Sequence, residues 1–356
     1  KVYQGCFVGM GDSAECFALT LTEAQCLEVL PAEEQGPLDE GQLLVRMEYA
    51  GVQPLDSAIF NGETGLELPR VLGNEGVGVV ERSECPLFEV GTRIAFVLAK
   101  HREDSGSWQT MVQISKERAC IVVVPVDLAP QTAAAGITST IVALACLRHF
   151  TKGALLVIPG ACGAAGNALL QLASLRGMHV LALVRGSERV ARLAREFGGS
   201  GSVVAVDVTA PHWVELAFAQ CEDRDGADGV IDGVGGDALI RIADNLIRPH
   251  GRVVTYGAAA GAADEAQLAA ALERRSLRRI AESADSILSR RDASAHLQAA
   301  FAQVSAGKYE PRVWQEVPWH DAAKCLVPQP GWSEFHSASQ LSEGRFGRIL
   351  LRFDRS

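Results

Sequence analysis

The stretch "VIPGACGAAGNALLQLA", residues 157–173, constrains the fold of this 356-residue chain more than any other. A short apolar run leads into three glycines, Gly160, Gly163 and Gly166, and a helical pattern follows. This order predicts a strand, a tight turn and a helix whose first N–H groups are open to a pyrophosphate. Gly160 would permit the turn, Gly163 the approach of a phosphate, and Gly166 the packing of helix on strand. A turn with a purely structural role is the alternative.

The other residues of this turn, Cys162, Ala164 and Ala165, are predicted to line the bound dinucleotide. Cys162 is expected to face the pyrophosphate turn, near a helix N-terminus that could lower the pKa of its thiol. The interpretation that the sequence favours is that Cys162 is a small residue that fills a tight turn.

The next apolar run, "VLALVRGSER" (180–189), discriminates between two dinucleotides. Sites for NAD usually place a carboxylate at the end of this strand, where it accepts hydrogen bonds from the ribose 2′-hydroxyl. This chain has Arg185 there, followed by Ser187 and Arg189. A guanidinium can hold a 2′-phosphate in bidentate fashion. The pattern predicts NADP(H) as the cofactor, with a surface arginine that binds nothing as the alternative.

The chain around this motif predicts two domains. After residue 130, short apolar strands alternate with helices, which indicates βαβ units and a doubly wound parallel sheet. The first 125 residues, and the segments 312–319 and 347–353, are instead typical of a small β-barrel. We predict a barrel domain from residues 1–128 and 308–356, interrupted by a dinucleotide-binding domain from residues 129–307. Five strands are expected in the second domain: 155–159, 179–184, 202–206, 229–234 and 252–257.

Composition excludes several classes of partner. The formal net charge of −10 argues against nucleic acid and against anionic membrane surfaces. The basic stretch "RRSLRR" (274–279) is interpreted as a solvated face rather than a binding patch. No apolar run has the roughly 18–20 residues of a membrane span. The nine cysteines form no CxxC pair, which favours free thiols in a reducing compartment.

Three longer motifs resemble one enzyme family. The stretches "GVQPLDSAIFNGETGLELPRVLGNEGVGVVE" (51–81), "GSWQTMVQI" (106–114) and "IDGVGGDAL" (231–239) are similar to the medium-chain dehydrogenase/reductase superfamily. Within it, the chain resembles the zinc-independent branch of mitochondrial 2-enoyl thioester reductases and quinone oxidoreductases. The resemblance implies an α/β fold, with a GroES-like β-barrel domain and a Rossmann doubly wound parallel sheet.

The resemblance also implies where the reacting end of the cofactor lies. Gln53 would stand near the nicotinamide, where relatives usually carry Asn. Gly235, Tyr256 and Gly257 would line the cofactor cleft, beyond the carboxyl ends of the strands.

No metal is expected. Gln53 and Asn74 stand where zinc-dependent relatives have a thiolate and an imidazole. Neutral amides are poor zinc ligands.

The chain departs from the family at three places. In the loop "FNGETG" (60–65), Thr64 takes the position of a tyrosine that relatives use as an acid, which makes Thr64 the candidate catalytic residue. The stretch "IAESADS" (280–286) replaces a bulky segment of the acyl pocket. An insertion, "PQPGWSEFHSASQLSEG" (328–344), carries Trp332 and Phe335, which would cover either a neighbouring protein or their own domain.

These features leave three functions open. The first is an NADPH-dependent reductase of 2-enoyl thioesters, which transfers hydride to a C=C bond conjugated to a carbonyl. The second is a catalytically weakened family member that keeps NADPH and serves as a subunit of a larger complex. The third is a quinone oxidoreductase. A homodimer is also compatible with the family. The resemblance and the absence of an initiator Met favour the mitochondrial matrix, with the cytoplasm as the alternative.

Overall fold

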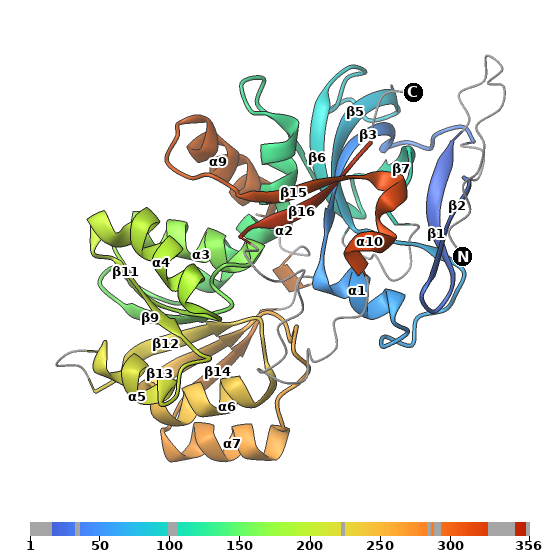
Figure 1. Ribbon diagram of the computed structural model, residues 1–356. Coiled ribbons are helices and arrows are strands. Elements are labelled where there is room, and N and C mark those ends of the chain that lie inside the picture. The colour runs from blue at the N-terminus through green and yellow to red at the C-terminus, as the bar shows by residue number, and fades with distance from the viewer. Residues whose placement is uncertain are drawn as a thin grey trace.

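The computed structural model describes residues 16–32, 36–98, 106–221, 225–282, 286–287, 293–326 and 346–353. These residues form two lobes with the long helix α2 (Pro130–Leu147) between them (Figure 1). The described residues start in the barrel lobe, pass through the sheet lobe after α2, and return to the barrel lobe for the last strands.

The barrel lobe contains two sheets. The larger has the order β15-β16-β3-β5-β6-β8, with β7 also paired to β3, and the smaller has the order β2-β1-β4. Alternate residues of β7 are buried, because one face of this strand packs on the barrel core, whereas β6 is buried over five consecutive residues. The strand bounds are β1 (Phe17–Glu23), β2 (Cys26–Pro31), β3 (Gln42–Val52), β4 (Arg70–Val71), β5 (Glu75–Ser83), β6 (Arg93–Leu98), β7 (Met111–Ser115), β8 (Ala119–Val123), β15 (Val313–Pro318) and β16 (Arg348–Arg352).

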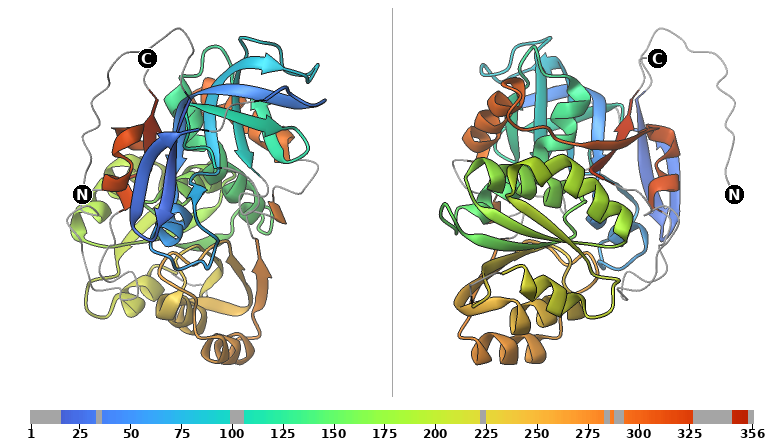
Figure 2. Two further views of the ribbon diagram at one scale, coloured as in Figure 1. Left: turned by 90° about the vertical axis from the view of Figure 1, so that its right-hand side faces the viewer. Right: turned by 60° about the vertical axis from the view of Figure 1, so that its left-hand side comes forward.

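The sheet lobe is a six-stranded parallel sheet with the order β11-β10-β9-β12-β13-β14. Helices α3 and α4 cover one face, and α5, α6 and α7 cover the other (Figure 2). Every residue of β9 is therefore buried, which explains its uninterrupted apolar sequence. The strands are β9 (Leu155–Pro159), β10 (His179–Val184), β11 (Val203–Asp207), β12 (Ala227–Asp232), β13 (Ile247–Thr255) and β14 (Arg278–Ala281). The helices are α3 (Ala164–Leu175), α4 (Ser187–Phe197), α5 (Trp213–Ala219), α6 (Gly236–Asn245) and α7 (Glu265–Arg274), with a 3₁₀ turn at Gly198–Ser200.

The predicted fold class is confirmed by this arrangement. The sixth strand, β14 (Arg278–Ala281), was not predicted, and its first two residues are the last two of the basic stretch. Arg274 pairs with Asp244 at 2.6 Å and Arg279 with Glu265 at 2.7 Å. Two of the four arginines of the basic stretch thus pair with carboxylates on helices α6 and α7, which agrees with its interpretation as a solvated face.

Helix α2 is the one helix in the described ranges with the length and hydropathy of a membrane span. However, 72% of that window is buried inside the fold. Its residues pack against strands of the barrel and against α3, so the core of the protein accounts for its apolar composition.

The chain returns to the barrel through α9 (Ala293–Ser305), which packs on α2 and β8. Strand β15, a 3₁₀ turn (Trp319–Asp321) and α10 (Ala323–Leu326) follow. The insertion at 328–344, with Trp332 and Phe335, lies outside the described residues. Residues 283–285, the centre of "IAESADS", also lie outside them.

Candidate functional site

The predicted glycine turn joins β9 to α3. Gly160 has φ +64°, a left-handed conformation that glycine adopts without strain. The N–H of Gly163 donates to the carbonyl of Gly160 at 2.9 Å, and Gly163 then caps α3 without offering a side chain. A Cβ on Gly166 would lie 2.4 Å from the Gly160 carbonyl oxygen. The turn therefore has the tight form predicted, and the first N–H groups of α3, at Ala164 and Ala165, receive no side-chain cap.

The Cys162 thiol does not have the lowered pKa that its place near a helix N-terminus suggested. Its side chain is only 5% exposed and belongs to the same buried cluster as Phe346. Burial raises the pKa of the thiol to about 11, although Arg189 and Arg192 lower it. The prediction of an acidic thiol at the pyrophosphate is therefore wrong, because desolvation outweighs the nearby positive charge. The favoured interpretation, a small residue that fills the turn, describes Cys162.

At the end of β10, Arg185 and Ser187 are exposed and Arg189 is half-buried. One guanidinium N–H of Arg189 donates to the carbonyl of Arg185 at 2.9 Å. Its Nε is buried and has no hydrogen-bond partner among the described residues. Buried polar groups nearly always have a partner, so an orphaned guanidinium N–H beside a glycine turn fits an anionic ligand.

Asp207, at the end of β11, was missed by the sequence analysis. Its carboxylate accepts hydrogen bonds from the N–H groups of Gly186 at 2.8 Å and Thr209 at 2.9 Å. Burial opposes ionisation, but these bonds and the charge of Arg189 lower the pKa of Asp207. Asp207 therefore fixes the loop that carries Arg185. An acidic residue that ends an apolar strand was the available signal.

The loops that follow β12 and β13 lie at the carboxyl ends of the parallel strands, as the glycine turn after β9 does. Asp232 accepts from the N–H groups of Val234 at 3.1 Å and Gly235 at 2.9 Å. A Cβ on Gly233 would lie 2.3 Å from the ring of Tyr256, so this ring lies directly on the glycine backbone.

These loops also reach the glycine turn. Val234 is 3.1 Å from where a Cβ on Gly160 would stand. Gly235 has φ +76° and caps α6, and Gly257 is exposed. The structure thus brings the predicted residues Gly235, Tyr256 and Gly257 to the strand ends around the glycine turn. Burial raises the pKa of the Tyr256 phenol, which stays protonated at neutral pH.

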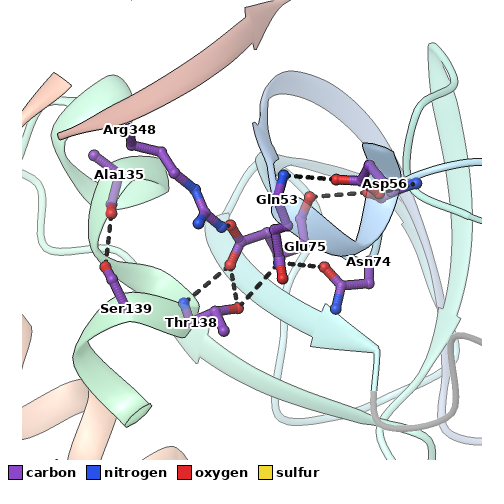
Figure 3. A network of polar contacts seen from close by, with 10 residues as sticks. Gln53, Asp56, Asn74, Glu75, Ala135, Thr138, Ser139 and Arg348 are labelled. Carbon is purple, nitrogen blue, oxygen red and sulfur yellow. Dashed lines mark hydrogen bonds and ion pairs between the residues drawn. The ribbon is translucent and has the colours of Figure 1, made fainter. Parts of the chain in front are cut away.

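In the barrel lobe, Gln53 belongs to a network of amides and hydroxyls (Figure 3). Its side-chain N–H donates to the Asn74 amide oxygen and, at 3.4 Å, to the Thr138 hydroxyl. Asn74 is 6% exposed. The two residues at the positions expected for zinc ligands are thus hydrogen-bonded to each other.

The described part of the chain holds no group of three or more His, Cys, Asp or Glu side chains arranged for a metal ion. The absence of zinc stays a prediction, and it rests on the chemistry of the amides.

The same network continues to a buried ion pair. Glu75, the first residue of β5, accepts from the backbone N–H of Thr138 at 2.9 Å and from its hydroxyl. The other carboxylate oxygen contacts the guanidinium of Arg348, the first residue of β16. The side chains of Glu75 and Arg348 are 0% and 6% exposed. The sequence analysis named neither, nor Thr138. A glutamate that opens an apolar strand was the available signal.

Asp56, in the helix α1 (Pro54–Phe60), lies on the other side of Gln53. It accepts from the N–H groups of Gln53 at 2.7 Å and Gly73 at 3.2 Å. Burial raises the pKa of Asp56 to about 6, although these hydrogen bonds and Arg348 lower it. A small cavity lined by Leu55, Ile59 and Leu72 adjoins this carboxyl.

The raised pKa of Asp56 predicts a pH-dependent stability. Because the folded carboxyl binds its proton more tightly than the unfolded one, its contribution is present below pH 4 and is lost as the pH rises through 6. Relative to Asp56→Asn, the unfolding free energy of the wild type should fall by roughly 2–3 kcal/mol between pH 4 and pH 7. Urea unfolding at both pH values measures this, with the exposed Asp39→Asn as control. An equal pH dependence in wild type and Asp56→Asn would contradict it.

Thr64 is half-buried in the turn that follows α1, whereas Gln53 caps the opposite end of this helix. The hydrogen bonds of the network around Gln53 do not include Thr64. The structure therefore does not bring the candidate acid together with the amide network.

Two family models match the chain. The model "Alcohol dehydrogenase GroES-like domain" matches residues 39–126, and "Zinc-binding dehydrogenase" matches residues 164–295. A probable quinone oxidoreductase of Schizosaccharomyces pombe is 27% identical over 245 residues, which are 67% of this chain and 69% of that protein.

Solved structures share the fold over nearly the whole chain. A quinone oxidoreductase of Pseudomonas syringae has a TM-score of 0.79 at 20% identity, covering 95% of this chain and 99% of that one. A mycobacterial protein solved in complex with NADPH has a TM-score of 0.76 at 21% identity, with the same coverage of 95% and 99%.

Proposed function

The chain belongs to the medium-chain dehydrogenase/reductase superfamily, and we propose that it is a zinc-independent oxidoreductase that uses NADPH to reduce quinones. The proposal draws on the quinone oxidoreductases among its relatives and on the site itself. A bound reduced nicotinamide supplies hydride.

The residues of the glycine turn fit such a cofactor. The uncapped N–H groups at Ala164 and Ala165 suit a pyrophosphate, and the orphaned Nε of Arg189 suits a further phosphate. Arg185, which precedes the Gly186 N–H that Asp207 accepts, is a further candidate to bind that phosphate.

The observation that carries the choice of substrate is the amide and hydroxyl network around Gln53. Hydride addition to a quinone gives a hydroquinone anion, a phenolate with a pKa near 10 that takes its proton from water. A 2-enoyl thioester instead needs a proton delivered to carbon by a positioned acid. Gln53 and Thr138 are neutral hydrogen-bonding groups, and neither is such an acid. Asp56 beside them has a pKa of about 6, so it is mostly ionised at pH 7, and both of its oxygens accept backbone N–H groups. The site therefore favours an acceptor that ends as an oxygen anion.

The test is an assay of purified protein with NADPH and two acceptors, a short 1,4-benzoquinone and a short-chain 2-enoyl thioester. NADPH binding with faster quinone reduction supports the proposal. NADPH binding without turnover of either acceptor would overturn it in favour of a non-catalytic subunit. Faster thioester reduction would instead favour the enoyl reductase.

The cofactor preference is tested separately by Arg185→Glu. One charge-assisted phosphate contact contributes roughly 1.5–3 kcal/mol, so the variant should lose at least about tenfold of the preference for NADPH over NADH. Titration of both cofactors measures the dissociation constants. Arg195→Glu, which changes an exposed arginine further along α4, is the matched control. Equal affinity of the wild type for NADPH and NADH would refute the assignment.

A further inference from the structure

We propose that Arg348 is a positioning residue, which acts through Glu75 to fix the Thr138 hydroxyl and the Gln53 amide, and which links them to the glycine turn. The inference rests on the proposed function only in placing the acceptor beside Gln53. Its structural part concerns the protein alone and can be tested without cofactor or substrate.

The first step is the series of contacts from Arg348 to Gln53, an ion pair followed by hydrogen bonds (Figure 3). The Arg348 guanidinium contacts one oxygen of Glu75, and the other oxygen accepts from the N–H and the hydroxyl of Thr138. Because the Thr138 hydroxyl donates to Glu75, its lone pairs point elsewhere and accept from the Gln53 amide at 3.4 Å. The orientation of Gln53 thus depends on an ion pair that it does not touch.

The second step is the space made for this pair. A Cβ on Gly51 of β3 would stand 2.1 Å from the Glu75 carboxylate and 2.8 Å from the Arg348 Nε. Only glycine leaves room there. Gly51 therefore offers a way to disturb the pair without changing any charge.

The third step is the link to the glycine turn. The N–H of Gly347 donates to the Cys162 carbonyl at 3.0 Å, and Gly347 forms a parallel bridge with Gly163. Gly347 has φ +110°, and a Cβ there would lie 2.3 Å from the Arg312 carbonyl. The residue next to Arg348 is therefore bonded to the turn that is suited to the pyrophosphate.

A purely structural ion pair is the competing explanation. Removing one partner of a buried pair destabilises a protein strongly, because it leaves a charge without compensation. Loss of activity in Arg348→Met alone would not separate the two roles. The double variant Arg348→Met/Glu75→Gln removes both charges and keeps an oxygen that can accept from Thr138.

The experiment compares four variants with the wild type: Arg348→Met, Arg348→Lys, the double variant and Gly51→Ala. Arg352→Met, which changes a half-exposed arginine on the same strand, is the control. The first readout is hydrogen exchange of the Thr138 amide without ligands. We expect exchange at least tenfold faster in Arg348→Met and Gly51→Ala, an intermediate rate in Arg348→Lys, and the wild-type rate in Arg352→Met.

The second readout is turnover with NADPH and the benzoquinone. In Gly51→Ala and in the double variant, kcat should fall at least about tenfold while KM changes less than threefold, since misplacement of about 1 Å can cost a hundredfold. Both variants should keep a cooperative thermal transition. Wild-type kcat in a folded double variant, or unchanged exchange in Gly51→Ala, would overturn the proposal. A wild type without quinone turnover would contradict the proposed function and leave the exchange result to decide this inference.

Discussion

Gly166→Val is expected to weaken NADPH binding at least about a hundredfold, which corresponds to the loss of two charge-assisted hydrogen bonds from the turn. A Cβ at this position would stand 2.4 Å from the Gly160 oxygen and 2.7 Å from the Ala161 Cα. Both are backbone atoms of the turn, so the side chain can be accommodated only by moving the turn away from α3. The N–H groups at Ala164 and Ala165 would then no longer converge on one anion.

The binding constant should be measured by fluorescence titration of NADPH. Gly198→Ala is the matched control, because Gly198 has φ −58° and nothing lies within 4 Å of its added Cβ. Both variants should keep the far-ultraviolet circular dichroism of the wild type. A dissociation constant for Gly166→Val within threefold of the wild-type value would refute the role of the turn.

The architecture of the sheet lobe was largely readable from the sequence. Strands buried on both faces have uninterrupted apolar runs, and β9 and β10 were predicted at their actual bounds and β11 and β12 within two residues of theirs. Strand β13 begins five residues before its predicted start. Strand β14 was not predicted, because it is a four-residue edge strand with three residues exposed and two of them arginines. An edge strand without a buried face leaves no hydrophobic pattern to read.

The residues of the site likewise fall into a set that the sequence predicted and a set that it did not. The glycines at 160, 163 and 166 were predicted because turn geometry is local and restricts the residue type. Glu75, Thr138 and Arg348 were missed because their roles arise from contacts between residues far apart in the chain: Thr138 and Glu75 are 63 positions apart. Glu75 and Arg348 were each visible as a charged residue in an apolar segment, but the sequence did not show that they pair with each other.

Cys162 shows a different limit. The position of the thiol at the start of α3 was correct, and the direction of its pKa was wrong. A helix N-terminus favours the thiolate only where the sulfur also keeps contact with water. Burial of the sulfur in the core removes that contact, in a cluster that also includes Phe346 from the far end of the chain.

Wild-type turnover of a short 2-enoyl thioester is expected to be about 10²–10⁴ times slower than that of an enzyme with a positioned acid. An ordinary enzyme turns over about 10 times per second. Gln53 caps the N-terminal end of α1, whereas Thr64 lies in the turn beyond its C-terminal end. The hydrogen bonds around Gln53 do not include Thr64, and a threonine hydroxyl is far less acidic than a phenol of pKa about 10.

Two substitutions at this position separate the explanations. Thr64→Tyr should raise thioester turnover at least tenfold and leave quinone turnover within twofold, since a hydroquinone anion takes its proton from water. Thr64→Val removes the hydroxyl at nearly constant volume and should leave both rates unchanged. A tenfold loss of thioester turnover in Thr64→Val would identify Thr64 as the acid after all. If Thr64→Tyr changes neither rate while NADPH still binds, the acyl pocket has been lost together with the family's bulky segment at 280–286, and no acid at position 64 can restore thioester reduction.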